Sequence, residues 1–282
     1  MTLDPEVARA TPEILRSHVE QAWNDRRLLE QPHYKAVVSE VMARLNHGEL
    51  RVAEKIDGAW KTHEWVKKAI VLFFPMSSMS IHKSGPFEWH DKVPIKSGLD
   101  RAGVRAVPGA IVRYSAFVEK GAVLMPSFVN VGARVGSGTM IDTWATVGSC
   151  AQVGRDCHVA GGVGIGGVLE PPAATPVIVE DHCFLGSRCI VVEGAIIEEG
   201  AVLGANVVVT ATTHIIDVTQ KEPVVYRGRV PANAVVIPGT RPKEFAGGTF
   251  GVPCALIIGR RSADTDRKTS LNSALRDYDV QA

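Results

Sequence analysis

The chain has 282 residues, of which 45% are hydrophobic and 22% are charged, and its formal net charge is +1. This composition is typical of a globular protein with one large or two modest domains. Because the net charge is small, bulk electrostatics give no reason to expect binding to nucleic acid or to an anionic membrane. No apolar run approaches the roughly 18 residues of a membrane-spanning helix.

Two features predict a cytoplasmic protein. The first fifteen residues carry Asp4, Glu6 and Glu13 and have no long apolar run, which is not the pattern of a secretory signal. The 5 cysteines are odd in number and include no Cys-x-x-Cys pair. We therefore expect reduced thiols that fill small buried spaces.

Residues 1–104 are predicted to form a small α/β domain. Apolar residues at helical spacing predict helices over Pro12–Trp23 and His33–Leu45, and Thr11 is placed to cap the first. The segment Trp65–Phe74 is expected to be a helix that runs into a strand. This domain would cover one end of the repeat that follows.

A strand and a turn lie between these helical segments. Leu50–Ile56 alternates as a strand does, and Asp57-Gly58 is a hairpin signal. Residues 59–63 would then form the returning strand.

A six-residue period dominates the middle of the chain. Sixteen apolar residues recur in two runs with one break: Ile111, Phe117, Val123, Val129, Val135, Ile141, Val147, Val153, Val159 and Ile165, then Val179, Leu185, Val191, Ile197, Leu203 and Val209. Period six fits neither an α-helix nor a simple strand, but it fits a chain that turns a corner every six residues. Stacked triangular coils would share one core. The sequence therefore predicts a β-helix over residues 105–240.

Glycine and proline punctuate this repeat. Glycine follows the inward residue at Gly136, Gly148, Gly154, Gly166, Gly186 and Gly204, which we attribute to backbone conformations that a Cβ disfavours. The break contains three prolines, and it is interpreted as an inserted loop near residues 170–177. This loop is expected to project from the wall, where it could cover the cleft of a neighbouring subunit.

Beyond the regular hexads the chain is predicted to close the open end of the coil. Val230 and Val236 are six residues apart and indicate a further coil, and Cys254–Gly259 is typical of an apolar strand. A final helix is expected over Leu271–Tyr278. Residues 241–282 would thus form a strand and helix cap, as solenoid ends require.

The hexads resemble those of the hexapeptide-repeat proteins, which implies a left-handed parallel β-helix. Four stretches narrow the resemblance: Gly48–Lys55, Asp91–Lys96, Met140–Gly154 and Gly161–Pro171. Together they resemble the tetrahydrodipicolinate N-succinyltransferases over nearly the whole chain. The resemblance implies transfer of a succinyl group from succinyl-CoA to tetrahydrodipicolinate, in lysine and diaminopimelate biosynthesis. It also implies a homotrimer with active sites between subunits.

The resemblance places an acceptor-contacting aspartate at Asp142, which follows the inward Ile141 and should lie on the outer surface. The acceptor amine is mostly ammonium near neutral pH, and a carboxylate beside it can accept a proton and fix its orientation. A second catalytic carboxylate does not transfer by position, because this chain has Ile190 where the more familiar branch of the family has glutamate. Glu193 is the nearby candidate, although its position also suits a turn residue.

Substrate carboxylates in a cleft need cationic partners, and arginine suits them best. The resemblance assigns this role to Arg105. Charge and location add Arg113 and Arg188, for which a solvated surface arginine is the alternative.

The CoA co-substrate is expected along the glycine run and near the C-terminal basic cluster. The predicted contacts are Trp144, Gly162, Gly164, Gly166, Gly167, Arg260, Arg261 and Lys268. Glycines allow a thin pantetheine arm to approach the backbone, but they equally suit tight stacking. Trp144 could be an interface aromatic instead, and the basic cluster a solvated face.

Two other functions keep the fold. Acetyl-CoA could replace succinyl-CoA as donor, since no residue of the acyl pocket is identified. A non-enzymatic scaffold is the third possibility, but it gives no reason for Asp142 or the glycine run. No metal is expected, because His158, His182 and His214 are scattered and lack the paired spacing of zinc ligands.

Overall fold

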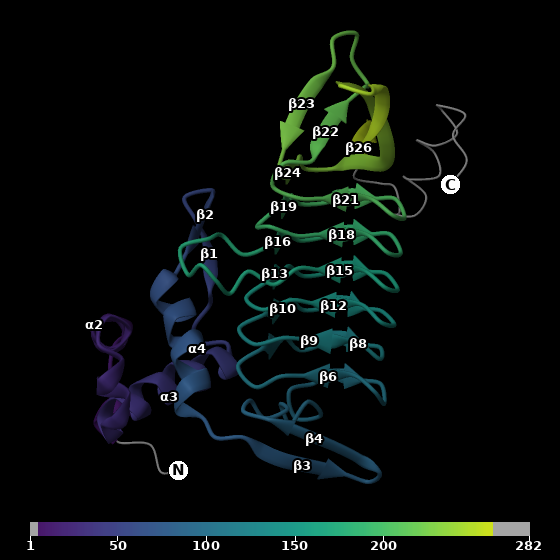
Figure 1. Cartoon of the computed structure of the whole chain (residues 1–282). Coiled ribbons are helices and arrows are strands. Elements are labelled where there is room, and N and C mark those ends of the chain that lie inside the picture. Colours follow the sequence, from purple (N-terminus) through teal and green to yellow (C-terminus); the bar gives the residue numbers. More distant parts are fainter. Residues whose placement is uncertain (1–4, 262–282) are drawn as a thin grey trace.

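The computed structural model describes residues 5–261. A tall coil of short parallel strands forms the body of the molecule, with helices along one side and a cap of longer strands at its upper end (Figure 1). Within these residues, no helix combines the length and the apolar character needed to cross a membrane.

The N-terminal helices follow the predicted pattern closely. Their bounds are α1 (Pro5–Ala8), α2 (Pro12–Asn24), the 3-10 helix η1 (Arg26–Glu30), α3 (Pro32–His47) and α4 (Glu64–Met76). The Thr11 hydroxyl accepts a hydrogen bond from the Ile14 N–H, as expected of an N-cap. The predicted change from helix to strand within Trp65–Phe74 is wrong. Buried Trp65, Val66, Ala69 and Ile70 lie at helical spacing, so one helix packs this apolar run into the core.

Two hairpins accompany the helices. Strands β1 (Ala53–Ile56) and β2 (Ala59–Thr62) confirm the predicted turn at Asp57-Gly58, whose residues have φ of 51° and 79° as a type I′ turn requires. Strands β3 (Ser80–Ser84) and β4 (Phe87–Asp91) form a second hairpin below the coil (Figure 1), which the sequence analysis did not identify.

The coil is closed by three parallel sheets, and each turn of the chain contributes one strand to each. Sheet 1 contains β6 (Ile111–Val112), β9 (Phe128–Val129), β12 (Thr146–Val147), β15 (Gly164–Ile165), β18 (Ile190–Val191) and β21 (Val208–Val209). Sheet 2 contains β7 (Phe117–Val118), β10 (Arg134–Val135), β13 (Gln152–Val153), β16 (Ile178–Val179), β19 (Ile196–Ile197) and β24 (Arg229–Val230). The coiled part of sheet 3 contains β5 (Arg105–Ala106), β8 (Val123–Leu124), β11 (Met140–Ile141), β14 (His158–Val159), β17 (Phe184–Leu185) and β20 (Val202–Leu203).

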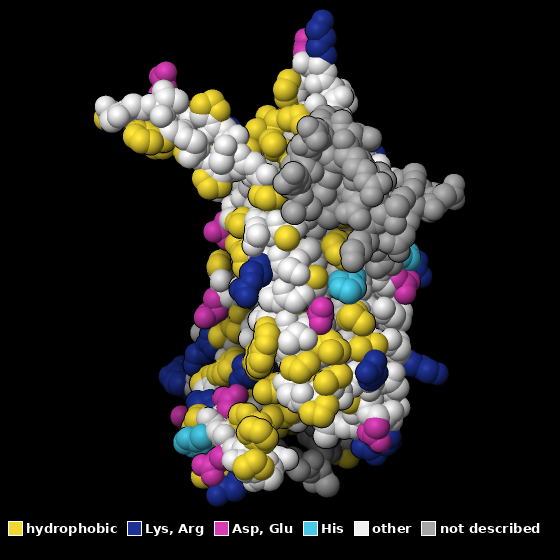
Figure 2. All heavy atoms as spheres, turned by 90° about the vertical axis from the view of Figure 1, so that its right-hand side faces the viewer, with side chains coloured by type: hydrophobic (Ala, Val, Ile, Leu, Met, Phe, Trp, Pro, Cys, Tyr) yellow, Lys and Arg dark blue, Asp and Glu magenta, His cyan; other side chains and the backbone are white. Residues whose placement is uncertain are grey.

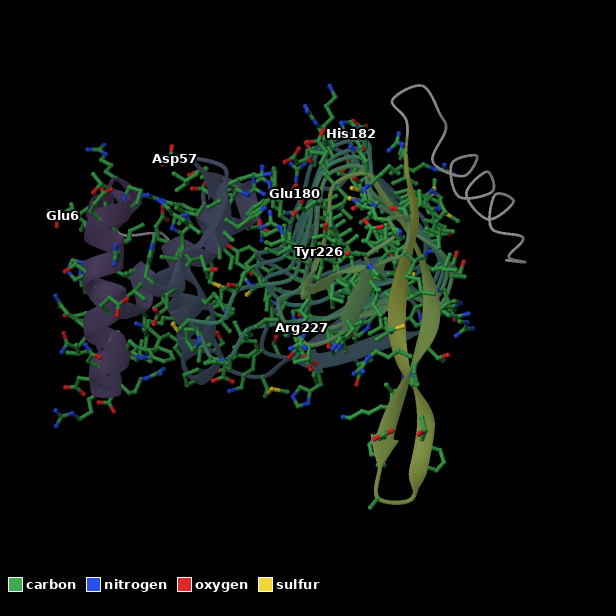
Figure 3. All side chains as sticks on the ribbon, turned by 90° about the horizontal axis from the view of Figure 1, so that it is seen from above. Glu6, Asp57, Glu180, His182, Tyr226 and Arg227 are labelled. Carbon is green, nitrogen blue, oxygen red and sulfur yellow. The ribbon has the colours of Figure 1, made fainter. Side chains whose placement is uncertain are left out.

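The cap extends sheet 3 with four longer strands. These are β25 (Ala234–Phe245), β26 (Gly248–Arg260), β22 (His214–Asp217) and β23 (Val224–Arg227). Val230 and Val236 are fully buried, so the predicted extra coil is confirmed. The β25–β26 hairpin projects sideways from the body (Figure 3). The predicted helix at Leu271–Tyr278 lies outside the described residues, and the domain boundaries at residues 104 and 240 stay predictions.

The six-residue spacing identifies the core correctly from Val129 onward, where every inward residue of the two runs is buried. In the first coil the predicted inward position is wrong by one residue. Val112, Val118 and Leu124 point inward, and not Ile111, Phe117 and Val123. The step from Leu124 to Val129 is then five residues, so the register breaks twice. Both residues of each early strand are apolar, and apolar spacing alone therefore does not decide which of them faces the core.

The glycines that follow inward residues serve close stacking. Gly136, Gly148, Gly154 and Gly186 do not have positive φ, so the conformational explanation is wrong for them. A Cβ added to Gly148 would lie 2.1 Å from the backbone nitrogen of Gly167 in the next coil. Positive φ recurs every six residues at the corners instead, at Gly132, Gly138, Trp144, Cys150, Asp156 and Gly162.

This stacking predicts an asymmetric response to two glycine substitutions. Gly148→Ala should lower the free energy of unfolding by about 1–3 kcal/mol, because its methyl group would meet backbone that cannot move aside. Gly161→Ala is the matched control, since its Cβ would lie 3.4 Å from the Thr143 carbonyl oxygen, an ordinary contact. Denaturant unfolding of both variants gives the comparison. Equal losses would mean that coil stacking does not demand glycine at position 148.

Candidate active site

Four of the predicted site residues share one corner of the coil, where strands of sheet 3 lead into strands of sheet 1. Asp142 and Trp144 lie in the turn between β11 and β12, and Arg188 lies in the turn between β17 and β18, two coils higher. Gly162 lies between them. Trp144, Gly162 and Arg188 have φ of 61°, 70° and 60°, so equivalent positions of successive turns stack on one another. We call these four residues the Asp142 corner.

The Asp142 carboxylate is held by its own turn. Its Oδ1 accepts hydrogen bonds from the Thr143 backbone N–H at 2.6 Å and from the Thr143 hydroxyl at 3.2 Å. The Asp142 backbone N–H donates to the Val159 carbonyl in the next coil at 2.8 Å. Among residues 5–261, Oδ2 has no hydrogen-bond partner. One carboxylate oxygen is therefore fixed, and the other is open to an amine.

An apolar surface adjoins this corner. Trp144 is 78% exposed, and Ile190 and Val208 point outward from neighbouring strands of sheet 1 with 37% and 45% exposure. Figure 2 shows hydrophobic side chains gathered over the lower coils on the side of the molecule that it presents. Exposed apolar surface of this kind marks a contact site for a ligand or another chain.

The glycine run Gly161–Gly167 is closely packed from above. A Cβ on Gly164 would lie 2.9 Å from Ile190 Cδ1, and one on Gly166 would lie 2.7 Å from Val192 Cγ1. A Cβ on Gly162 would lie 3.3 Å from Arg188 Cγ, which is a milder contact. Tight stacking therefore accounts for Gly164 and Gly166, and the contacts of Gly162, Gly164, Gly166 and Gly167 with CoA stay a prediction.

The predicted arginines fall into different surroundings. Arg105 is exposed on β5, two strands below β11 in sheet 3, which places it about 10 Å along the coil axis from the strand that ends at the Asp142 corner. Arg113 lies where sheet 1 leads into sheet 2, and its guanidinium donates to Asp91 Oδ2 at 2.6 Å and to Asn130 Oδ1 at 3.0 Å. Burial opposes ionisation of Asp91, but hydrogen bonds from Lys92 N–H and Arg113 lower its pKa. Arg113 is thus committed to an ion pair within the chain.

Glu193 is not brought to Asp142 within one chain. It follows β18, so it lies at the end of sheet 1 where strands finish, whereas Asp142 precedes β12 at the edge where strands begin. Its φ of 58° is that of a turn residue, and its Oε2 accepts from the Ala211 N–H at 3.3 Å. The turn role that the sequence left open is therefore observed.

The described part of the C-terminal basic cluster is already engaged. Arg260 Nη2 lies 2.6 Å from the buried Asp217 Oδ2, and Arg261 Nη1 donates to the His182 carbonyl at 3.0 Å. Burial opposes ionisation of Asp217, but hydrogen bonds from Thr219 and Arg260 lower its pKa. Lys268, the third predicted CoA contact of this cluster, lies outside the described residues.

The inserted loop, residues 166–177, is held against the N-terminal helices of its own chain. Lys67 of α4 is fully buried, and its Nζ donates to the carbonyls of Pro171 at 3.2 Å and Ala174 at 2.6 Å. Leu169 packs against the same helical core. Burial lowers the pKa of Lys67. The sequence analysis missed this residue, although a lysine inside the apolar run Trp65–Phe74 was the available signal.

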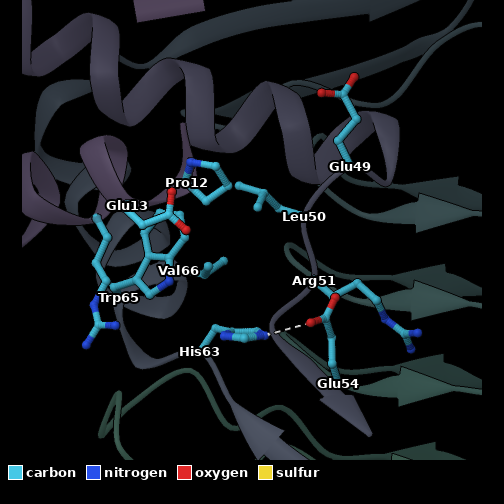
Figure 4. A pocket seen from close by; sticks show the side chains of 10 residues that line it. Pro12, Glu13, Glu49, Leu50, Arg51, Glu54, His63, Trp65 and Val66 are labelled. Carbon is cyan, nitrogen blue, oxygen red and sulfur yellow. Dashed lines mark hydrogen bonds and ion pairs between the residues drawn. The ribbon is translucent and has the colours of Figure 1, made fainter. Parts of the chain in front are cut away.

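Of two further hollows, one lies within the N-terminal part and the other between it and the coil, and neither is lined by a predicted site residue. The first, of about 380 Å³, is lined by Glu13, Arg16, Arg51 and the Glu54–His63 pair, whose Oε2 and Nε2 are 3.0 Å apart (Figure 4). The second, of about 260 Å³, is bordered by Glu180, which accepts from Lys55 Nζ and Trp60 Nε1 at 2.7 Å each. Both hollows are seams between packed elements.

The cysteines and histidines offer no alternative chemistry in the described residues. All five cysteines are free and buried, as predicted. Burial raises the pKa of Cys150 to about 12 and that of Cys189 to about 11, so they are poor nucleophiles. Within residues 5–261, no three His, Cys, Asp or Glu side chains gather as metal ligands would.

A coil of stacked hexads is the fold of the hexapeptide-repeat proteins. Residues 176–211 match a family described as hexapeptide repeat of succinyl-transferase, and residues 14–76 match one described as tetrahydrodipicolinate N-succinyltransferase N-terminal. The chain belongs to the tetrahydrodipicolinate N-succinyltransferase family, whose fold is a left-handed parallel β-helix with an N-terminal domain.

Near full-length relatives support this assignment. The chain is similar to proteins named 2,3,4,5-tetrahydropyridine-2,6-dicarboxylate N-succinyltransferase from several bacteria. That of Methylobacterium sp. (strain 4-46) is 50% identical over 92% of this chain and 97% of its own length. That of Caulobacter vibrioides is 47% identical over 93% and 99% of the two chains. That of Afipia carboxidovorans is 52% identical over 83% and 86%.

The inserted loop should loosen when its buried lysine is removed. Lys67→Met leaves the Pro171 and Ala174 carbonyls without their donor, which should cost about 1–3 kcal/mol. We expect faster hydrogen exchange at the amides of residues 166–177. Lys61→Met, at an exposed position of β2, is the control. Exchange as slow in Lys67→Met as in the control would show that apolar packing alone holds the loop.

Proposed function

We propose that the protein transfers the succinyl group of succinyl-CoA to tetrahydrodipicolinate with uptake of one water molecule, giving N-succinyl-2-amino-6-oxopimelate and CoA in lysine and diaminopimelate biosynthesis. The observation that carries this proposal is the open Oδ2 of Asp142, on the same corner of the coil as Arg188, in a member of this family. The proposed place of reaction is the cytoplasm, consistent with five buried thiols and no disulfide among the described residues.

Asp142 would act on the acceptor amine. The amine must be unprotonated to attack the thioester carbonyl, and a fixed carboxylate can accept its proton and direct its lone pair. Because the acceptor is a cyclic imine, water first adds to its C=N bond and makes the ring nitrogen an amine. The bond from this nitrogen to the succinyl carbonyl then forms, the C–S bond breaks, and CoA leaves as the thiol after taking up a proton. Opening of the ring leaves the oxygen of the added water as the 6-oxo group of the product. Because Oδ1 is tied to Thr143, the rotation of the carboxylate is restricted and Oδ2 keeps one direction.

Arg188 and Arg105 are the proposed carboxylate partners. Arg188 is exposed on the Asp142 corner, and no ion pair among the described residues involves it. Arg105 is exposed below the same corner. Either guanidinium can bind a carboxylate through two parallel hydrogen bonds. Arg113 is a weaker candidate, since a substrate carboxylate would have to displace Asp91.

The active form is proposed to be a homotrimer. The exposed outer face of sheet 1, with Trp144, Ile190 and Val208, offers an apolar surface that another copy would cover. Sites between subunits would also bring a second carboxylate to Asp142. A second carboxylate such as Glu193 lies at the wrong edge of sheet 1 to serve Asp142 of its own chain, so it would have to come from a neighbour.

A thiol-release assay with tetrahydrodipicolinate, run with succinyl-CoA and with acetyl-CoA, tests the reaction. We expect release with succinyl-CoA to be much faster. Asp142→Asn should lower kcat by about a hundredfold or more, because an amide cannot accept the proton. Faster release with acetyl-CoA would overturn the proposed donor. No release with either donor would leave the chain as a scaffold.

The role of Arg188 separates binding from chemistry. Arg188→Gln should raise the KM for tetrahydrodipicolinate about tenfold with little change in kcat, because one charge-assisted contact to a carboxylate is lost. Arg155→Gln is the matched control, since Arg155 is an exposed arginine that pairs with Asp181 away from this corner. A KM that stays at the wild-type value in Arg188→Gln would remove this residue from the site.

A further inference from the structure

A group of cations surrounds a hollow at the upper end of the coil, outside every segment that the sequence analysis assigned to the site. The hollow, of about 350 Å³, is lined by Thr212, Thr213, His214, Arg241, Lys243, Val252 and Pro253. Arg227 adjoins it, because its Nη2 lies 3.1 Å from His214 Nε2 on the neighbouring strand. Arg227 is the last residue of β23, one of the four cap strands, and it is labelled in Figure 3. We call this the upper cation hollow.

The charges of this hollow are not neutralised within the described chain. No ion pair among residues 5–261 involves Arg227, Arg241 or Lys243, whereas nearby Arg260 is paired with Asp217. The Lys243 ammonium lies over an aromatic face, with its Nζ 5.2 Å from the centre of the Phe245 ring. Partial burial and the neighbouring Arg241, Arg227 and Lys243 hold the pKa of His214 below its usual value. Like charges are thus gathered, which is unfavourable unless a ligand compensates.

Arg241 supplies a second and independent sign of a ligand. Its Nε is buried and has no hydrogen-bond partner in the described residues. A donor on a cation that loses water without gaining an acceptor costs free energy, and such groups in folded proteins usually have a partner. The Arg241 side chain lines the hollow, so an anion bound there would compensate the charge of its guanidinium.

We propose that the upper cation hollow binds a phosphate group. Two guanidinium groups and one ammonium group exceed what one carboxylate can neutralise, whereas a phosphate monoester carries up to two charges and three acceptor oxygens. Thr212 and Thr213 also line the hollow, where their hydroxyls lie 3.3 Å and 3.1 Å from the Thr210 hydroxyl. Arginine pairs with phosphate through two parallel hydrogen bonds, which suits the two arginines here.

The position of the hollow allows two sources for this phosphate. Thr212 and Thr213 follow β21, which is three strands above β12 in sheet 1, so the hollow lies about 14 Å along the axis from the level of Asp142. An elongated co-substrate with its thioester at Asp142 could run between subunits, along the edge of the face of Ile190 and Val208, and reach the hollow with a phosphate. This source rests on the proposed function. A separate phosphate compound bound at the hollow alone is the other source.

Calorimetric binding to the full chain distinguishes these sources without requiring turnover. The probes are CoA, 3′-dephospho-CoA and inorganic phosphate, each titrated into the wild type, Arg241→Leu, Lys243→Gln and the control Arg155→Gln. Leucine keeps the apolar volume of the Arg241 stem, and circular dichroism checks the fold. The exposed Lys243→Gln provides a second variant if Arg241→Leu does not fold.

If the phosphate belongs to CoA, Arg241→Leu should raise the Kd for CoA about tenfold or more and leave that for 3′-dephospho-CoA unchanged. If it belongs to a separate compound, inorganic phosphate should bind the wild type and the control but not Arg241→Leu, and the Kd for CoA should stay constant. Either result supports the hollow as a phosphate site. The proposal would be overturned if each probe had the same Kd in all four proteins, whatever the thiol-release assay shows.

Discussion

The structure depends on how closely one coil lies on the next. Neighbouring strands in each sheet are joined by parallel backbone hydrogen bonds, so successive coils are separated by about 4.8 Å. The inward aliphatic side chains fill the interior of this stack as one continuous core. At Gly148 the corner itself comes so near the following coil that a methyl group would not fit. Every functional group on the outside is positioned by this repeated spacing.

The corners of the coil hold the side chains of the candidate site at repeated positions on the surface. A residue in a corner with positive φ holds its side chain outward at the same place in every coil, so Trp144, Gly162 and Arg188 form a column. Asp142 lies at the start of this column and is fixed by its own turn. Groups on such a wall move little when a ligand binds, which favours pre-organised chemistry. Glu193 lies in a corner at the opposite edge of sheet 1. The strands of that sheet therefore separate it from Asp142 within one chain.

The sequence predicted those features that a periodic pattern encodes. From Val129 onward the hexads identify the inward residues, and Asp57-Gly58 predicts its turn because few residues adopt φ > 0 twice in succession. Where both residues of a strand are apolar, the pattern alone does not say which of them points inward, and at Ile111–Val112 it identified the wrong one. It also misses side chains whose role depends on distant segments, such as Lys67, which meets carbonyls more than 100 positions away. The role of Asp142 came from resemblance, since a turn aspartate has no periodic signature.

Charge balance decides which of the arginines remain available. Arg113 and Arg260 each lie 2.6 Å from a carboxylate oxygen, and the pairing also lowers the pKa of Asp91 and Asp217. Pulling such an arginine away would leave a partly or fully buried carboxylate uncompensated, which costs more than a new surface contact returns. Arg188 and Arg241 form no such ion pair within the described chain. From their sequence positions alone, the four arginines are equally good candidates for binding an anionic substrate. They differ in whether the guanidinium already pairs with a carboxylate of the same chain. An arginine without such a partner can bind the substrate, and an arginine with one is structural.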